Sequence, residues 1–538
     1  MKSFLNISFL LLLLWTTTIA AHSQTGSTIN AASCSQSDVQ TALNSVTSNT
    51  AVVTIPSGTC HWTGQLVTIV PSVNTNLTIQ GSTTVNCTGT PGTSGYSCTP
   101  TDNTIIVDDY TSSASIWVIN MSSNSSCPLS CYFRMTGFTM EVGAGTAKDN
   151  GEITFNGPSD NFRLDHYHWN GGGGVIMGRL FGEFRGVLDH FYCENGGQCI
   201  IFSNNNDDSI GYGDGSWTAP TNFGSSDFMF MEDFVMSGGL LEDCDTGGRF
   251  VARYGNVLNP TTVYSAVLHT HGTKTPAGRG RGCRAYEAYH LYFQGPAAPL
   301  YAAMSSAGGP SLVWNINLAS GYQNMAGVEA PRNDQEETET STPNGWGYCG
   351  TSPNGNGVGS QWDGNNNAGT GWPCLDGVGR GQGTQALNGV DFPGALNSST
   401  GTIAWPHEML EPVYYFNNTF PNANEMLVLD ASTQLNRDLY IDNASFNGTT
   451  GTGSGPASSK PSSCTAGPGG TYGTSPTGSY GVAYWETDNQ QLDICTATNT
   501  WKNGAYKPYT YPHPLESGST NTNSSPQPPT NLNGTVVQ

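Results

Sequence analysis

Positive charge is scarce in this chain of 538 residues. Lysine and arginine together number 18 against 40 acidic residues, which gives a formal net charge of −22. Nonspecific nucleic-acid binding depends on many cations that neutralise phosphates, so this composition argues against a nucleic-acid partner. Charged residues of both signs make up only 11% of the chain, whereas 68 residues are glycine. That composition is typical of many short strands joined by turns, and 10% aromatic residues argue against simple disorder.

Long apolar runs are also missing, apart from one near the first residue. The run 4–15 follows a positively charged start, and the small residues at 20–23 offer a cleavage site before Gln24. This pattern predicts a signal peptide over residues 1–23, too short to be a spanning helix. An uncleaved anchor is the alternative. We therefore expect a secreted protein, extracellular or periplasmic, that is soluble and has no membrane span.

The cysteines support export. All 14 lie beyond the predicted signal peptide, and an even number is typical of paired thiols in an oxidising compartment. None forms the paired C-x-x-C pattern of a zinc site. Spacing alone does not fix the connectivity, but we expect mostly local disulfides. These are Cys34–Cys60, Cys87–Cys98, Cys127–Cys131, Cys193–Cys199 and Cys349–Cys374.

Helical periodicity is nearly absent, and a six-residue pattern recurs in its place. The pattern is an apolar residue, a polar residue, then His, Asp, Asn or Gly, two variable residues and a large apolar residue. The clearest copies are LDHYHW (Leu164 to Trp169), LDHFYC (Leu188 to Cys193) and MEDFVM (Met231 to Met236). Looser copies are RYGNVL (Arg253 to Leu258), AYHLYF (Ala288 to Phe293), FNNTF (Phe416 to Phe420) and IDNASF (Ile441 to Phe446). The polar residues fit a tight bend, where Asn, Asp and His tolerate unusual backbone angles.

The spacing of these copies predicts the architecture. Copies that follow one another lie about 22–25 residues apart, which suits one turn of a parallel β-helix whose coils share a core. We therefore expect Leu164, Leu188, Met231 and Arg253 at equivalent positions on stacked strands, with Trp169 turned inward. The helix-like segment 37–46 would cap the N-terminal end. A β-sandwich or a propeller is the alternative.

Several segments resemble a known family. VVTIPSGTCHWTGQLVTI (Val52 to Ile69) followed by NLTIQG, the LDH-containing strands and RFVARYGNVL resemble coils of secreted proteins of the pectin-lyase-like superfamily. The resemblance covers roughly residues 30–450 and implies an all-β, right-handed parallel β-helix, a solenoid with an N-terminal capping helix and long loop insertions. It specifies fold better than activity, because lyases, hydrolases, tailspikes and noncatalytic surface proteins share the architecture.

The expected organisation has four parts. A signal peptide occupies 1–23, and the β-helix occupies 24–450 with a loop insertion at about 321–400. A Gly/Ser-rich linker and an aromatic strand segment follow over 451–515, and 516–538 is a mobile tail.

Compact catalytic motifs are absent, so the distribution of basic residues guides the search for a site. Residues 163–290 hold nine of the 18 Lys/Arg and six of the ten His. Residues one coil apart in a β-helix lie about 4.8 Å apart, so these groups can converge. We expect one solvent-facing groove for an anionic glycan, formed by Arg249, Arg253, His269, His271, Lys274, Arg279, Arg281 and Arg284. The alternative is that Asp243, Asp245 and Glu287 pair with them and brace the coils.

The resemblance implies a polysaccharide lyase that cleaves a uronate-containing glycan by β-elimination. Such an enzyme needs a cation at the uronate carboxylate and a base, often Arg or Lys, and calcium held by carboxylates often serves the first role. The catalytic candidates are Arg279, Arg281, Arg284, His269 and His271, and the substrate-binding candidates are Arg249, Arg253 and Lys274. Ca²⁺ is the implied cofactor, an anionic polysaccharide the partner, and a monomer the expected state. A noncatalytic surface or adhesive glycan-binding protein and a glycoside hydrolase on the same fold are the alternatives.

Overall fold

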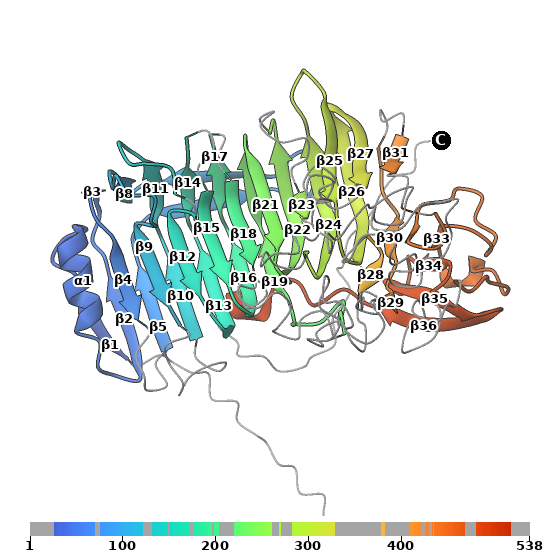
Figure 1. Cartoon of the computed structure of the whole chain (residues 1–538), viewed down its shortest axis with the longest axis horizontal. Coiled ribbons are helices and arrows are strands. Elements are labelled where there is room, and N and C mark those ends of the chain that lie inside the picture. The colour runs from blue at the N-terminus through green and yellow to red at the C-terminus, as the bar shows by residue number, and fades with distance from the viewer. Residues whose placement is uncertain are drawn as a thin grey trace, which may run out of the picture.

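Parallel β-strands build almost all of the molecule (Figure 1). The structure is a computed structural model. It describes residues 26–69, 76–121, 132–148, 150–172, 176–195, 198–203, 220–260, 268–270, 282–328, 378–381, 409–420, 425–429, 433, 435–467 and 480–517. Within these residues the strands form one sheet of 18 strands and one of 10, and every strand pair in both sheets is parallel. The all-β character predicted from the sequence is therefore confirmed.

The pairings resolve into three ladders of stacked strands. The first ladder contains β1 (Ser27–Asn30), β2 (Thr50–Thr54), β5 (Asn76–Gln80), β10 (Tyr132–Thr136), β13 (Ser159–Asp165), β16 (Phe184–Asp189), β19 (Met229–Glu232), β22 (Arg249–Leu258), β24 (Ala285–Gln294), β26 (Ser311–Ser320), β30 (Val413–Phe416) and β32 (Leu439–Tyr440). The second ladder contains β3 (Gly58–Trp62), β8 (Thr104–Asp108), β11 (Thr139–Val142), β14 (His168–Asn170), β17 (Tyr192–Glu194), β20 (Phe234–Ser237) and then the second halves of β22, β24 and β26.

The third ladder is the ten-stranded sheet. It contains β4 (Leu66–Ile69), β9 (Trp117–Asn120), β12 (Ile153–Asn156), β15 (Ile176–Phe181), β18 (Gln198–Ser203), β21 (Leu240–Asp245), β23 (Leu268–Thr270), β25 (Leu300–Ser306), β27 (Tyr322–Val328) and β31 (Glu425–Leu429). From β2 to β27 the chain visits the first, second and third ladders in turn and then begins again. Each passage therefore forms one coil stacked on the last, an arrangement compatible with a parallel β-helix.

The register of the first ladder confirms the predicted repeat at three of its four positions. Leu164 lies opposite Leu188, and Leu188 lies opposite Met231. Met231, however, lies opposite Ala252, so the prediction for Arg253 is wrong by one residue. Because side chains alternate between the two faces of a strand, that slip moves Arg253 from the interior to the outward face.

The bends between the first and second ladders explain the His, Asp and Asn of the repeat. His166, His190, Asp233, Tyr254 and His290 all have φ between 50° and 53°. This left-handed conformation is unfavourable for most residues but tolerated when a side chain bonds locally. His166 Nδ1 lies 2.7 Å from Asp165, and His190 Nδ1 lies 2.9 Å from Asp189. The polar residues of the repeat therefore form the bend, as predicted.

Large apolar side chains from all three ladders fill the interior. Trp62, Trp117 and Trp169 have no exposed surface and belong to one continuous core. The expected inward orientation of Trp169 is confirmed. Truncating such a buried side chain to alanine typically costs about 3–5 kcal/mol.

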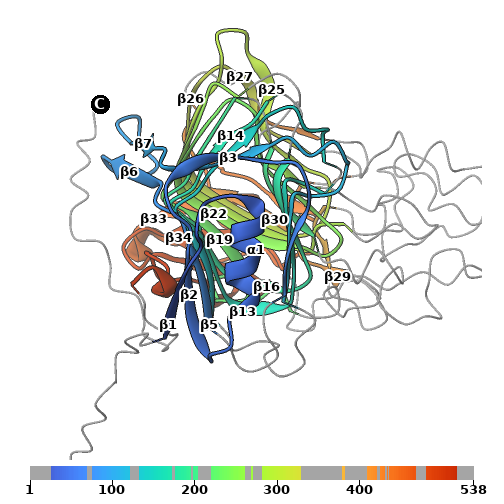
Figure 2. The same cartoon turned by 90° about the vertical axis from the view of Figure 1, so that its left-hand side faces the viewer.

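The only α-helix of the described residues lies at the N-terminal end of the stack (Figure 2). Helix α1 (Gln36–Asn44) begins at Ser35, whose hydroxyl accepts a hydrogen bond from the backbone N–H of Asp38. Its buried residues join the core. Gln40 makes two hydrogen bonds to the backbone of Val67 in β4.

Three smaller sheets accompany the two large ones in the described residues. The antiparallel hairpin of β6 (Thr84–Thr88) and β7 (Ser97–Thr101) interrupts the coil between β5 and β8. A four-stranded sheet contains β33 (Thr452–Gly455), β34 (Ala483–Glu486), β35 (Gln491–Ala497) and β36 (Thr500–Tyr506). Strand β33 thus lies within the segment predicted as a linker. A pair of two-residue strands, β28 (Arg380–Gly381) and β29 (Met409–Leu410), completes the list.

Five disulfides join described cysteines. Three of the predicted pairs are confirmed: Cys34–Cys60, Cys87–Cys98 and Cys193–Cys199. Cys244–Cys283 and Cys464–Cys495 were not predicted. The predicted pairs Cys127–Cys131 and Cys349–Cys374 lie outside the described residues, as do the predicted signal peptide and most of the insertion at 321–400. In the part of the chain that the structure describes, no helix has the length and apolar character needed to cross a bilayer.

Candidate functional site

The predicted basic residues separate into three groups in the structure. Arg253 and Arg284 are fully buried, and Arg249 and His269 are partly exposed. His271, Lys274, Arg279 and Arg281 lie outside the described residues. The solvent-facing orientation predicted for the whole set therefore does not hold for Arg253 and Arg284, and their catalytic and substrate-binding roles stay predictions.

Arg253 can be buried because a carboxylate, a hydroxyl and two backbone carbonyl groups accept its hydrogen bonds. Its Nε and Nη2 both lie 2.5 Å from Oε2 of Glu232 on the preceding coil. Its remaining N–H groups donate to the hydroxyl of Tyr289 and to the backbone oxygens of Tyr509 and Thr510, at 2.8–2.9 Å. Burial opposes the charge of Arg253, but the negative charge of Glu232 outweighs it and raises the pKa of the guanidinium.

Arg284 and His269 also lie beside carboxylates. Arg284 Nη2 is 2.8 Å from Glu411, a residue 127 positions further along the chain. His269 Nδ1 is 3.3 Å from Asp243, the residue opposite it on β21. The sequence analysis considered only acids close in sequence. The stacked coils also bring acids from distant positions next to these residues. For Asp243 the predicted bracing contact is present.

Arg249 differs from these residues because it lines a cleft. The cleft has a volume of about 130 Å³ and lies at the edge where strands of the third ladder lead into the first. Its lining residues are Leu180, Gly182, Glu183, Phe184, Arg185, Phe202, Ser203, Pro220, Asn222, Asp227, Met229, Gly247, Gly248 and Arg249. Among the predicted basic residues that the structure describes, only Arg249 belongs to this lining.

The two arginines of the cleft have contrasting surroundings. Arg185 lies 2.5 Å from Asp160, 3.4 Å from Asp227 and 3.7 Å from Glu183. Burial opposes its charge, but the hydrogen bond to Asp160 raises the pKa of Arg185. Arg249 donates to the backbone oxygen of Pro220 at 2.9 Å. Burial, and to a smaller extent the positive charge of Arg284, lowers the pKa of Arg249 to about 10.

The described residues that follow the cation-rich segment 271–281 lie beside this cleft. Gly247 in the lining donates its backbone N–H to the oxygen of Gly282, and Arg284 donates to the oxygen of Gly248. Lys274, Arg279 and Arg281 lie outside the described residues, so the predicted groove stays a prediction.

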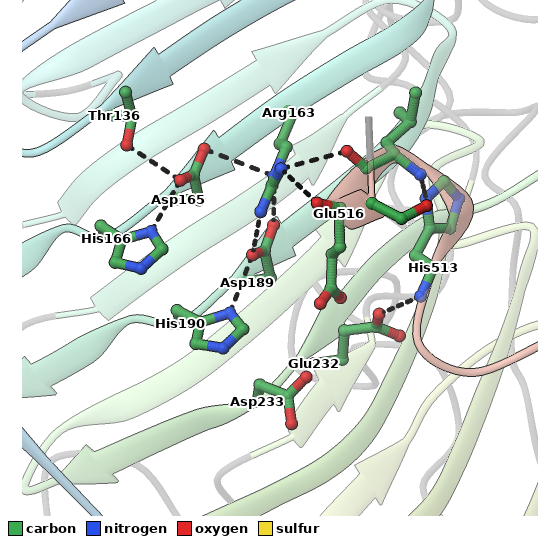
Figure 3. A network of polar contacts seen from close by, with 12 residues as sticks. Thr136, Arg163, Asp165, His166, Asp189, His190, Glu232, Asp233, His513 and Glu516 are labelled. Carbon is green, nitrogen blue, oxygen red and sulfur yellow. Dashed lines mark hydrogen bonds and ion pairs between the residues drawn. The ribbon is translucent and has the colours of Figure 1, made fainter. Parts of the chain in front are cut away.

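A second polar cluster lies on the outward face of the first ladder (Figure 3). The residues directly before the bends form what we call the outward row: Thr136, Asp165, Asp189, Glu232, Arg253, Tyr289, Trp314 and Phe416. All are buried. Tyr289, Trp314 and Phe416 pack against the C-terminal sheet, and Glu232 and Arg253 bond to the segment 507–517. Figure 1 shows that segment in red, running back along the stack.

Arginines from the neighbouring strands neutralise the first acids of the row. Arg134 forms a bidentate pair with Asp165, with both N–O distances at 2.6 Å. Arg163 does the same with Asp189, at 2.7 and 2.9 Å, and also donates to the backbone oxygens of Leu515 and Glu516. Burial opposes the ionisation of Asp165, but the hydrogen bonds from Arg134 and His166 lower its pKa.

Two overlapping groups in this region have the composition and spacing of metal ligands. One is Asp189, His190 and Glu516, and the other is Glu232, Asp233 and Glu516. Glu232 and Asp233 belong to the repeat copy MEDFVM, whereas no sequence pattern indicated Glu516. The repeated Asp-His and Glu-Asp pairs were a signal for the row, and they were interpreted only as bend residues.

Comparisons of this chain with protein-family models, with curated proteins and with solved structures found no match. The site therefore has to be interpreted from its own geometry.

Proposed function

We propose that this chain is an exported polysaccharide-active protein with the right-handed parallel β-helix fold of the pectin-lyase-like superfamily, and that it cleaves a uronate-containing glycan by β-elimination. Three features support the fold: the cyclic order of the three ladders, the bend residues of the repeat and the position of α1, which we interpret as a cap. The disulfides support export, because such bonds persist in oxidising compartments.

The cleft around Arg185 and Arg249 carries the proposal. Elimination needs a cation that stabilises negative charge on the uronate carboxylate and a base that removes the adjacent C5 proton. Arg185, with its raised pKa, remains a cation and suits the first role. Arg249, with its pKa lowered to about 10, suits the second, because about one molecule in a hundred is neutral at pH 8.

The positive and negative charges of the described lining residues are equal in number. Arg185 and Arg249 face Glu183 and Asp227 in the cleft. A net attraction for an anionic glycan therefore requires further cations, and Lys274, Arg279 and Arg281 are the ones that the sequence predicts. This is why the proposal retains these three residues, with His271, as candidates.

The calcium implied by the family resemblance does not fit this cleft. Of the described lining residues only Glu183 and Asp227 are carboxylates, and both are ion-paired with Arg185. Calcium ions in proteins are coordinated by six to eight oxygen ligands. We therefore derive no step of the elimination through a metal ion in the cleft.

A panel of uronate polymers tests the proposal. The secreted protein is incubated with polygalacturonate, alginate and polyglucuronate, and the ultraviolet absorbance of the new double bond is followed. We expect product with at least one polymer, and a rate that rises about tenfold per pH unit below the pKa of the base. Arg249→Gln should lower kcat by at least about 100-fold, while Arg249→Lys should keep part of the activity.

Lys502→Gln is the matched control, because Lys502 is an exposed cation on β36 in the C-terminal sheet. It should leave turnover unchanged. Turnover at the wild-type rate in Arg249→Gln would exclude Arg249 as the base. Release of reducing sugar without ultraviolet absorbance would favour the glycoside hydrolase, and retention on an immobilised polymer without any turnover would favour the noncatalytic surface protein.

A further inference from the structure

Three separate parts of the chain meet over one bend of the first ladder. Glu232 and Asp233 form the bend between β19 and β20. Glu516 reaches it from the C-terminal segment 507–517, as Figure 3 shows. Tyr96 belongs to the β6–β7 hairpin, and its backbone oxygen accepts a hydrogen bond from Asn256 on the neighbouring coil. None of these four residues lines the cleft.

The spacing of the carboxylates suits one large divalent ion. One oxygen each of Glu232, Asp233 and Glu516 lies within 4.8 Å of the other two. Calcium binds oxygen at about 2.3–2.6 Å, so ligands on opposite sides of the ion stand about 4.8 Å apart. Magnesium usually keeps several waters and is bound through one or two carboxylates, so three protein carboxylates favour calcium.

Around Glu232, Asp233 and Glu516, acidic groups outnumber the arginines that pair with them. Arg163 is paired with Asp189, and Arg253 is paired with Glu232. His513 offers no further cation, because its Nδ1 accepts a hydrogen bond from Leu515, and burial lowers its pKa. When both are ionised, Asp233 and Glu516 add two negative charges, which one divalent cation would balance. Without such a cation, burial and the neighbouring Glu232 raise the pKa of Glu516 to about 12. Buried charge without such compensation is strongly unfavourable.

An independent observation comes from Tyr96. Its side chain is only 4% exposed, and its hydroxyl has no hydrogen-bond partner among the described residues. Burial, then the charges of Asp233, Glu516 and Asp189, raises the pKa of Tyr96, so the phenol lies within the field of this cluster. Oε1 of Glu516 likewise has no hydrogen-bond partner in the described chain. Buried polar atoms nearly always have a partner, and Tyr96 packs in one buried cluster with Val235, two residues from Asp233.

We propose that Glu232, Asp233 and Glu516 bind one calcium ion, and that this ion fastens the C-terminal segment to the coils. The ligand set is made of oxygens, which suits a hard cation. Asp189 and His190 flank Glu516 on its other side, and Tyr96 belongs to the buried cluster that contains Val235. The remaining coordination positions are left to water.

Cation binding to the full-length protein tests this site without any assay of turnover. The protein is treated with EDTA, dialysed, and titrated with Ca²⁺ by calorimetry and with Tb³⁺ by luminescence excited through tyrosine. Tyr511 donates to Asp233 at 2.6 Å, so a bound lanthanide would have a close sensitiser. We expect one tyrosine-sensitised site, a Tm that falls on EDTA treatment and recovers with Ca²⁺, and a weaker response to Mg²⁺.

Two variants locate the ion. Glu516→Gln and Asp233→Asn keep the side-chain shape but remove one charge each, and each should abolish the Tb³⁺ signal and the Ca²⁺-dependent rise in Tm. Asp488→Asn, an exposed carboxylate in the C-terminal sheet, is the control and should keep both. Circular dichroism confirms that the variants retain β-structure.

Either of two results overturns the proposal. A stripped protein with unchanged Tm and no Tb³⁺ signal would mean that Glu232 and Glu516 share a proton in place of a metal. A calcium response that survives in both variants would place the ion elsewhere. Loss of lyase activity alone affects neither conclusion, because the cleft and the calcium ligands share no residue.

Discussion

Replacement of Arg253 by alanine is expected to destabilise the protein by about 3–5 kcal/mol while leaving the cleft intact. Arg253 and Glu232 have no exposed side-chain surface and lie 2.5 Å apart. Removing one partner of a buried pair leaves the other charge without compensation, and that loss has the stated size. Arg253 also packs over the ring of Phe230, at 4.5 Å from its centroid, so the loss should lie toward the upper end.

The Arg253→Ala variant should also weaken the attachment of the segment 507–517 to the coils. The backbone oxygens of Tyr509 and Thr510 each lose a donor when Arg253 is truncated. Arg253→Lys keeps the charge but cannot reach four acceptors at once, because lysine lacks the planar fork of arginine. We therefore expect Arg253→Lys to be intermediate in the free energy of unfolding. Limited proteolysis should release the C-terminal segment faster from both variants than from the wild type.

Urea unfolding at equilibrium measures the loss, with Lys502→Ala as an exposed control that should change stability by no more than about 0.5 kcal/mol. Because Glu232 is also a proposed calcium ligand, the double variant Arg253→Met, Glu232→Leu is compared with the wild type in EDTA. There it should recover much of the lost stability, since apolar replacement of a whole buried pair is often neutral. A loss below about 1 kcal/mol in Arg253→Ala would refute this account of the pair. Arg253 would then return to the list of candidate ligand-binding residues.

Three further outcomes are expected. Arg284→Ala should lower stability by about 3–5 kcal/mol, because its partner Glu411 is only 5% exposed; unchanged unfolding with lost turnover would assign it to the site instead. Burial raises the pKa of Glu287 to about 7, so the native state holds its proton more tightly than the unfolded chain, and stability is lost as pH rises from about 4.5 to 7. Glu287→Gln should flatten that loss, which we expect to be on the order of 3 kcal/mol in unfolding measured at pH 5 and 8. Replacing Cys244 and Cys283 by alanine should cost about 4 kcal/mol, because their bond closes a loop with a sequence separation of 39; equal denaturation midpoints under reducing and non-reducing conditions would contradict this.

The coil architecture was predictable because the repeat carries two independent signals. Leu164, Leu188 and Met231 mark the inward position, and the polar residues that follow mark the bend, so fold and register agree at each copy. The slip at Arg253 arose where the signals conflict. Ala252 is a small residue at the inward position, and the following Arg-Tyr-Gly lacks the Asp or Glu of the clearer copies, so the alignment moved by one residue.

The candidate site was less predictable because its partners come from distant positions. Glu411 lies 127 residues from Arg284, and Thr510 lies 257 residues from Arg253. No local pattern indicates such contacts. The density of basic residues included Arg249, which lines the cleft. It could not distinguish a residue that lines the cleft from one that braces coils.

The C-terminal segment changes how this stack can come apart. Coils in a repeat protein depend mainly on their immediate neighbours, and unfolding can therefore begin at one end and proceed coil by coil. Residues 507–517 bond to Arg253, Glu232 and Arg163 on three different coils. They are also the last part of the stack to leave the ribosome. A chain that ends before residue 507 would keep the pairing of neighbouring coils but lose these bonds between separate coils, so its unfolding should be less cooperative.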